Sequence, residues 1–330
     1  MTSLKGTKVA MIRTISLLVA FAAIPAFAYT PPSQQQLDLS AESFQLRDGV
    51  VADPARSAVY VMTRAGVQAI DVEGGDTLWT TDAAQRPVGL YGDQLVALAT
   101  PEAAGRLKLA LLDVRTGQVV TTISAGLPEG VSATVVDGPG RQFQAGLNVA
   151  GGAFFQWRSV GRPLVGAPVV AGELPSVQQV QEGVLQLNPA AGEATAVDRA
   201  AAPKPPAFRF DLAADEQLAG VQGRQFRAGD DRHVLATEKR SGSDGFNRYR
   251  WTLHDRVGGA IGSVDRPVST APFFVSGATL VHEAGPVLRR LDTGDFETKG
   301  LRLVAADLRS GVELWSVDLR DTAYRGVLPP

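Results

Sequence analysis

Apolar residues along this chain either alternate with polar ones or form short uninterrupted runs, and both patterns are typical of β-strands. Weak alternation over residues 37–51 predicts one or two strands, through Leu37, Leu39, Phe44 and Leu46. Further strands are predicted at 58–62, 66–70, 77–80, 94–98, 107–112 and 118–123. Gly, Pro and Asp mark the turns, and no segment keeps a long apolar period of 3.6 residues, so we predict an all-β chain.

One hairpin pattern recurs along the chain. It has Ala, then Asp two residues later, Gly six later and Trp ten later. Two complete copies stand far apart: Ala69, Asp71, Gly75 and Trp79, then Ala305, Asp307, Gly311 and Trp315. Partial copies lie at 111–117 (with Asp113 and Gly117), 155–161, 186–192 and 253–259 (with Asp255 and Gly259). Such self-similarity indicates a repeat architecture.

The pattern has a physical explanation as a β-hairpin. The Asp side chain can accept hydrogen bonds from turn amides, and the Gly supplies the positive φ that a short hairpin with a bulge requires. A Trp at a fixed offset can pack against the neighbouring unit, and the small Ala leaves room for close approach. We therefore expect these positions to be structural.

The spacing of the copies sets the size of the unit. Unit lengths of roughly 40 to 50 residues suit four short strands with their turns, the size of one β-propeller blade. A first such unit is expected over 44–82, and a degenerate one could lie within 208–227. We predict a β-propeller of six to seven four-stranded blades. The rival architecture is a pair of β-sandwich domains divided near the Pro-rich stretch 200–206.

The N-terminus resembles a secretory signal. Residues 1–28 carry Lys5, Lys8 and Arg13, then an apolar run from Ile15, then Ala-Phe-Ala before Tyr29. We predict a signal peptide at 1–28, a polar linker at 29–36 and the propeller domain at 37–330; translation starting at Met11 would give a shorter signal. The apolar run is too short for a comfortable membrane span. The mature chain is thus expected to be exported to the periplasm or secreted, with no transmembrane span.

Composition narrows the chemistry. The chain has no Cys, which excludes disulfides, thiol catalysis and a lipid anchor on an N-terminal Cys. Without the three basic signal residues the balance is 29 basic against 34 acidic residues, a net charge of −5. Such a mildly acidic protein has no nucleic-acid-binding character.

The repeat resembles that of the PQQ-like, or quinoprotein-like, β-propeller family. The likeness rests on the two complete copies and on the Arg115-Thr-Gly117 and Arg309-Ser-Gly311 turns. It implies a radial array of blades with Trp79 and Trp315 each docked on the adjacent blade. It also implies closure of the ring by residues near 37–48 pairing with the last blade. The likeness is thin over residues 125–250, where Trp is missing from the expected place.

The family resemblance allows two activities. Its dehydrogenases hold PQQ over Ca²⁺ with Glu, Asn and Asp ligands, usually in much longer chains, and none of those positions maps onto this sequence. Its other branch, which includes the outer-membrane assembly propeller lipoprotein of Gram-negative bacteria, uses the repeat to bind proteins. This chain resembles that branch in size and export but has no lipid-bearing Cys.

Other chemical candidates have structural explanations. His233, His254 and His282 lack metal-ligand spacing, and the acidic pairs Asp230-Asp231 and Asp292 with Asp295 lack the oxygen density of a calcium loop. The Arg and aromatic mixture at 242–251 could be a protein-binding loop, although a blade strand with Arg at alternate positions explains it better.

Two functions therefore remain. The preferred one is an exported, non-catalytic propeller that binds another envelope protein and needs no cofactor. The alternative is a small PQQ- and Ca²⁺-dependent dehydrogenase of a sugar or alcohol.

Overall fold

The computed structural model describes residues 44–134, 141–161, 180–204, 211–228, 232–241, 247–266, 273–284, 287–290 and 296–320. The chain divides into a short unit, Met1–Gln36, and a larger one, Leu37–Pro330, to which all described residues belong. The predicted signal peptide and linker thus lie outside the described residues.

The described residues form strands throughout, with one short 3₁₀ turn, η1 (Pro54–Arg56). The first half of the chain holds β1 (Phe44–Arg47), β2 (Val50–Asp53), β3 (Ala58–Thr63), β4 (Gly66–Asp71), β5 (Thr77–Thr81), β6 (Arg86–Tyr91), β7 (Gln94–Leu98), β8 (Arg106–Asp113), β9 (Val119–Gly126), β10 (Arg141–Asn148) and β11 (Ala153–Gly161). The second half holds β12 (Val180–Asn188), β13 (Glu193–Val197), β14 (Arg224–Arg227), β15 (His233–Ser241), β16 (Asn247–Asp255), β17 (Gly259–Arg266), β18 (Phe273–Ser276), β19 (Thr279–Ala284), β20 (Val287–Arg290), β21 (Phe296–Lys299), β22 (Arg302–Asp307) and β23 (Glu313–Asp318).

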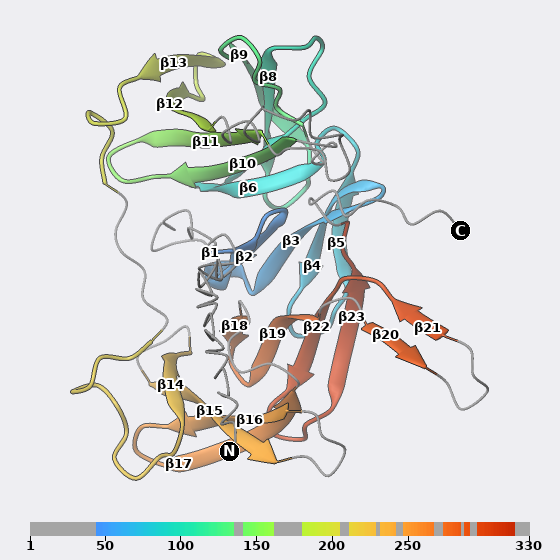
Figure 1. Cartoon of the computed structure of the whole chain (residues 1–330), viewed down its shortest axis with the longest axis vertical. Helices are drawn as coiled ribbons and strands as arrows, with labels where there is room; N and C mark the ends of the chain where they lie inside the picture. The colour runs from blue at the N-terminus through green and yellow to red at the C-terminus, as the bar shows by residue number, and fades with distance from the viewer. Residues whose placement is uncertain are drawn as a thin grey trace, which may run out of the picture. The chain divides into compact units, whose positions relative to one another are not determined.

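These strands make five antiparallel sheets and one separate hairpin (Figure 1). Sheet 1 has the order β1-β2-β3-β4-β5, sheet 2 β6-β7-β8-β9, sheet 3 β10-β11-β12-β13, sheet 4 β14-β15-β16-β17 and sheet 5 β18-β19-β22-β23. The two-stranded hairpin β20-β21 is inserted between β19 and β22. The prediction of an all-β chain built of four-stranded units is therefore confirmed, with a fifth strand in sheet 1.

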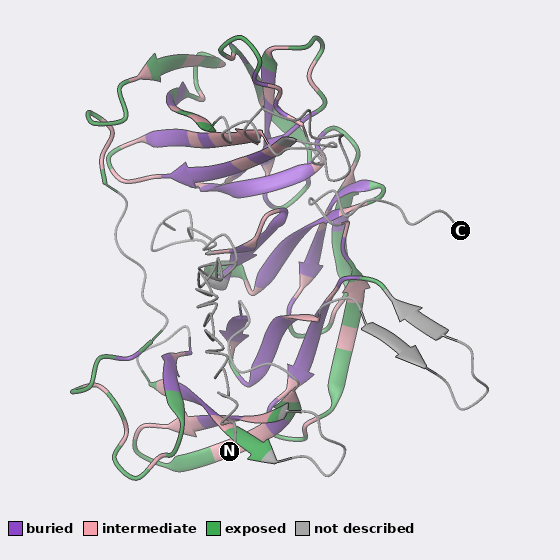
Figure 2. Ribbon diagram, in the orientation of Figure 1, coloured by how far each residue is buried: buried purple, intermediate pink, exposed green. Residues whose placement is uncertain are grey.

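Burial follows position within each sheet (Figure 2). Strands near the start of a sheet, such as β2 and β3, are buried almost throughout and are correspondingly apolar. The last strands, β5, β9 and β23, have mostly exposed residues with a few buried or half-buried ones, which is why polar residues are interleaved there. Strands covered on both faces are continuous apolar runs, whereas half-covered ones alternate.

Four apolar clusters lie between sheets and fix which sheets are neighbours. One cluster joins sheets 4 and 5, a second joins sheets 5 and 1, a third joins sheets 1 and 2, and a fourth joins sheets 2 and 3. The second is the informative one, because Leu46 and Val50 of the first sheet pack in the same cluster as Val281 and Leu303 of the last. The two ends of the chain's β-structure are thereby joined.

Three sequence expectations need correction. The copy at 155–161 is not a hairpin: it lies inside the long strand β11, where Gly161 pairs with Arg141. Residues 44–47 pair with β2, not with the last sheet, so packing of side chains joins sheets 1 and 5 at that point. Within 208–227, the described part contributes only β14 and an isolated bridge between Asp211 and Phe226, so no separate four-stranded unit occurs there.

Among the described residues, no helix has the length and apolar character that crossing a bilayer requires.

Candidate functional site

In each of the five sheets, the same kind of turn connects the last two strands. The turn residues Asp71 and Gly75 join β4 to β5, and Asp113 and Gly117 join β8 to β9. The corresponding pairs in the other sheets are Asn188 and Gly192, Asp255 and Gly259, and Asp307 and Gly311. All five glycines have φ between 70° and 86°, the left-handed region. Five of the six copies noted in the sequence thus mark equivalent hairpins, one in each sheet.

The Asp side chain holds the turn as the sequence predicts. In sheet 2 the Gly117 amide donates to the Asp113 carbonyl at 2.8 Å, and the Asp113 carboxylate accepts from the Arg115 and Thr116 amides at 3.0 and 2.9 Å. A hydrogen bond from the Thr116 hydroxyl, with those amides, lowers the pKa of the Asp113 carboxyl. Amides of Val257 and Gly258, with Arg232, lower the pKa of Asp255 to about 2. These carboxylates are engaged in shaping their own turns.

The two signature tryptophans dock on the turn of the next sheet. Trp79 of sheet 1 donates from Nε1 to the Val114 carbonyl of sheet 2 at 2.8 Å, and a Cβ on Gly117 would lie only 2.5 Å from its ring. Trp315 of sheet 5 donates to the Val72 carbonyl of sheet 1 at 2.9 Å, and a Cβ on Gly75 would overlap its ring. Each turn glycine therefore serves two needs, positive φ and room for an indole ring.

The signature alanines lie directly across the hairpin from the tryptophans. Ala69 pairs with Trp79, and Ala305 pairs with Trp315, in the same register. Both alanines are fully buried. Trp79 also stacks on Tyr60, with ring centroids 5.7 Å apart.

Two further junctions use the same place without a Trp. A Cβ on Gly192 of sheet 3 would lie 3.4 Å from the Thr122 carbonyl oxygen of sheet 2, and a Cβ on Gly311 of sheet 5 would lie 3.4 Å from the Ser263 carbonyl oxygen of sheet 4. At Gly259 of sheet 4, a Cβ would meet nothing within 4 Å. In each of these four junctions, the last strand of one sheet lies against the turn glycine of the next sheet. The junctions connect the sheets in the order 4, 5, 1, 2, 3, which is also the order that the apolar clusters give.

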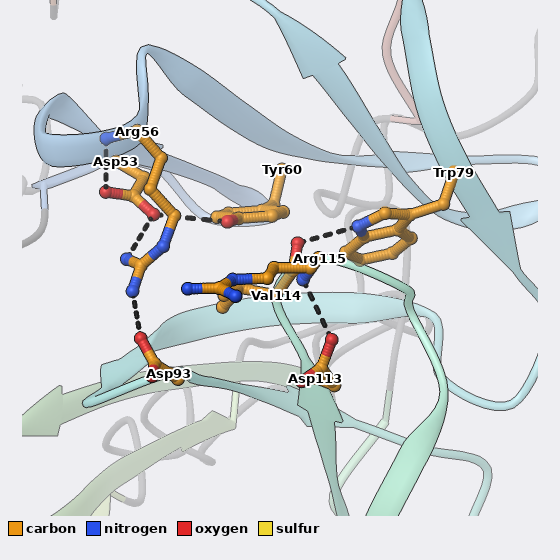
Figure 3. A network of polar contacts seen from close by, with 8 residues as sticks. All are labelled: Asp53, Arg56, Tyr60, Trp79, Asp93, Asp113, Val114 and Arg115. Carbon is orange, nitrogen blue, oxygen red and sulfur yellow. Dashed lines mark hydrogen bonds and ion pairs between the residues drawn. The ribbon is translucent and has the colours of Figure 1, made fainter.

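A polar network supports the junction between sheets 1 and 2 (Figure 3). Asp53 is buried at the end of β2 and accepts hydrogen bonds from the Arg56 amide, from Arg56 Nη1 at 2.9 Å and from the Tyr60 hydroxyl at 3.2 Å. Arg56 also pairs with Asp93 of sheet 2. Burial and the Asp53 carboxylate raise the pKa of Tyr60. Asp53 therefore orients both an inter-sheet ion pair and the ring on which Trp79 stacks.

A second network, which we call the polar hub, consists of Gln45, Arg47, Asp48, Arg86 and Glu283. Arg86 is fully buried, with Nη2 3.0 Å from Asp48 Oδ1 and Nη1 donating to the Phe143 carbonyl of sheet 3 at 2.9 Å. Gln45 donates to the Ala145 carbonyl of sheet 3 at 3.2 Å, and Arg47 pairs with Glu283 of sheet 5 at 2.9 Å. The first hairpin, β1-β2, is thus tied to sheets 2, 3 and 5.

Sequence reasoning missed both networks. The residues of the polar hub come from places far apart in the sequence, and each looks like an ordinary surface charge or amide there. The one available signal is an Arg at the head of the run Arg86–Tyr91, which the structure buries almost throughout.

The histidines lie in structural surroundings. His282 is buried, with Nε2 accepting from Arg266 Nε at 2.7 Å and Nδ1 2.9 Å from the Glu283 carbonyl. Burial lowers its pKa to about 4. Burial also lowers the pKa of His254. Asp230, Asp231, Asp292 and Asp295 lie outside the described residues.

The Arg and aromatic segment is largely a strand. Residues Asn247–Asp255 form β16, in which Trp251 is fully buried, Arg248 is exposed and Arg250 pairs with Asp265 at 2.9 Å. The strand interpretation is confirmed for the described part, and residues 242–246 lie outside it.

In the described ranges, no group of three or more His, Asp or Glu side chains could hold a metal ion.

Comparison with known proteins gives little further information. No family model matches the chain, and no curated protein matches it. Among solved structures, the chain is similar to an uncharacterized protein of Listeria monocytogenes EGD-e, with 11% sequence identity, coverage of 86% of this chain and 85% of that one, and a TM-score of 0.26.

Proposed function

We propose that this chain is an exported, non-catalytic scaffold of the PQQ-like β-propeller type that binds another protein of the cell envelope. The observation that carries the proposal is the repeated docking of one sheet on the next, with Trp79 on Gly117 and Trp315 on Gly75. This is the blade-to-blade contact that the family resemblance implies. Repeat arrays of this kind present extended surfaces to partners.

The chemistry of the buried charges supports a scaffold. Arg86, Asp48 and Asp53 make contacts within or between sheets, and these contacts hold the sheets together. The Asp carboxylates of the described turns accept hydrogen bonds from backbone amides of the same turn. Charged groups with these contacts stabilise the fold, so we expect a partner protein to be bound by the exposed surface.

Export rests on the sequence of residues 1–28, with its basic start, apolar run and small residues before Tyr29. The number of blades is part of the proposal: the described residues supply five sheets, and we expect six to seven blades in the whole chain from the spacing of its repeats.

The experiment that separates the two functions is calorimetric titration of the purified mature protein with PQQ and Ca²⁺. The scaffold proposal predicts neither heat of binding nor a thermal shift. Saturable micromolar binding would contradict it and would favour the dehydrogenase of a sugar or alcohol.

A positive test is chemical cross-linking of the mature protein in envelope extract, followed by reconstitution with the purified partner. We expect one protein to cross-link in a saturable way and to bind again when purified. Failure to recover any specific, reconstitutable partner would overturn the scaffold proposal.

A further inference from the structure

Three outer strands present an aliphatic side chain to solvent at the same place. Leu78 of β5, Val120 of β9 and Leu314 of β23 each follow their turn glycine by three residues and are 52%, 54% and 43% exposed. Val119 and Val312, in the same hairpins, are 45% and 58% exposed. Large exposed aliphatic side chains that recur at an equivalent position call for an explanation other than chance.

The exposure is built into the backbone. In all three hairpins the register shifts by one residue, and the extra residue is the aliphatic one: Leu78, Val120 or Leu314. Such a β-bulge leaves its residue outside the ladder and re-aims its side chain. A bulge also discourages the addition of another strand at that edge. A partner would therefore meet these side chains rather than extend the sheet.

The three residues belong to consecutive sheets. Trp315 joins sheet 5 to sheet 1, and Trp79 joins sheet 1 to sheet 2. We call Leu314, Leu78 and Val120 together the rim row. Figure 2 colours most of these outer strands as exposed.

The charge beside the rim row is negative. The three hairpins, 71–79, 113–121 and 307–315, contain six acidic residues and two arginines, a net charge of −4, against −2 for the whole chain. Three of the acidic side chains, Asp71, Asp113 and Asp307, accept hydrogen bonds from turn amides. The other three, Glu73, Asp76 and Glu313, are exposed, and Glu313 Oε1 also lies 3.9 Å from Arg302 Nη1. Basic side chains on a partner would be attracted to these carboxylates, and acidic side chains would be repelled.

We infer that the rim row binds a segment of another protein that carries both aliphatic and basic side chains, the aliphatic ones against Leu314, Leu78 and Val120 and the basic ones against Glu73, Asp76 and Glu313. This inference rests on the proposed scaffold function and names the surface and the chemistry of its partner. The apolar contacts supply most of the affinity, and the charges supply selection against acidic segments.

A synthetic peptide of alternating Leu and Lys, with a matched Leu and Glu peptide, tests this inference by fluorescence anisotropy. We expect the basic peptide to bind and the acidic one not to bind. The triple variant L78S/V120S/L314S should weaken binding roughly tenfold or more. The control variant V180S/V257S removes two exposed aliphatic residues outside the row, Val180 at 43% and Val257 at 97% exposure, and should leave binding unchanged. The variant E73K/D76K/E313K should also weaken binding, with the loss most evident at low salt.

Equal affinity in the wild type and the row variant, or an equal loss in the control variant, would overturn the inference. Binding of the wild type to phosphatidylcholine vesicles, if the row variant abolishes it, would also overturn the inference and would assign the row to a lipid surface. Dimerisation that depends on concentration in sedimentation velocity, if the row variant abolishes it, would assign the rim row to a second copy of the chain.

If the row variant still cross-links to the envelope partner as the wild type does, the rim row is not the contact and the scaffold function stands. If neither protein captures a specific partner, the scaffold function itself fails.

Discussion

Trp79 shows how one side chain joins two sheets. Trp79 is 8% exposed, and its ring stacks on Tyr60 and donates to the Val114 carbonyl. Trp79→Ala should therefore cost about 3–5 kcal/mol of unfolding free energy, as deletion of a buried large aromatic does. Trp79→Phe keeps most of the packing but leaves the Val114 carbonyl without its donor, and should cost about 1–2 kcal/mol. Urea unfolding measures both.

Trp315 provides the comparison. Trp315 is only half-buried, although its ring makes the equivalent hydrogen bond to the Val72 carbonyl. Trp315→Ala should accordingly cost less than Trp79→Ala. The reverse order, or a loss below about 1 kcal/mol for Trp79→Ala, would contradict the docking described above.

His282 makes the stability depend on pH. Burial, with Arg266 donating to its Nε2, favours the neutral imidazole and holds its pKa near 4, below the ordinary 6.5. A depressed histidine pKa means that the unfolded chain binds the proton more tightly. The contribution of neutral His282 to the unfolding free energy is therefore complete above about pH 6.5. It falls as the pH drops toward 4, and the total loss is about 3 kcal/mol.

Comparison of unfolding free energies for the wild type and His282→Gln between pH 7 and pH 4 isolates this contribution. The groups that face His282 are Arg266 and Glu313, with the Glu283 carbonyl at Nδ1. The difference between the two proteins should shrink as the pH falls. His254→Gln controls for the other histidine with a lowered pKa. A difference that stays constant with pH would contradict the assignment.

The hairpin turn is the element that repeats, and its glycine has two separable roles. Gly117 and Gly92 both have positive φ, 70° and 58°, but a Cβ at Gly117 would meet the Trp79 ring whereas one at Gly92 would meet nothing within 4 Å. Gly92→Ala should cost about 1–2 kcal/mol for the backbone alone. Gly117→Ala should cost clearly more, because the indole must also move. Equal losses in thermal or urea unfolding would show that the ring does not lie on this turn.

Asp and Gly at the turn could be predicted from the sequence because their roles are local. The copy at 155–161 misled the prediction for an equally local reason. Where the pattern has Asp, that copy has Trp157, which cannot accept hydrogen bonds from turn amides, and apolar alternation continues through it into one strand. In the copy at 186–192, Asn188 keeps a side-chain acceptor, bonded by the Ala191 amide, and the hairpin forms.

The polar hub could not have been predicted in the same way. Asp48 and Arg86 come from different sheets, and no sequence pattern pairs them. Because Arg86 is fully buried, Asp48→Asn should destabilise the protein by about 2–4 kcal/mol by leaving that charge without its partner. The double variant Asp48→Asn with Arg86→Met removes both charges and should be more stable than Asp48→Asn alone. Additive losses in denaturant unfolding would contradict the pairing.

At the scale of the whole molecule, the last sheet is joined to the first. The evidence is the apolar cluster shared by sheets 5 and 1, the Trp315 hydrogen bond to Val72, and Ser57 with its hydroxyl 3.0 Å from that of Ser276. These contacts join residues more than two hundred positions apart, as in the Ser57–Ser276 separation of 219. Only the family resemblance suggested such a junction in advance.

The most direct test of this junction is a disulfide between sheets 1 and 5 in the variant S57C/S276C. The chain has no Cys of its own, so any cross-link comes from the introduced pair. Mild oxidation should give a monomeric, intramolecular disulfide with faster migration on a non-reducing gel and a higher unfolding temperature, since the bond closes a long loop. The single variants S57C and S276C should show neither change. Failure to cross-link in the folded protein, or formation of intermolecular dimers only, would contradict the joining of the last sheet to the first.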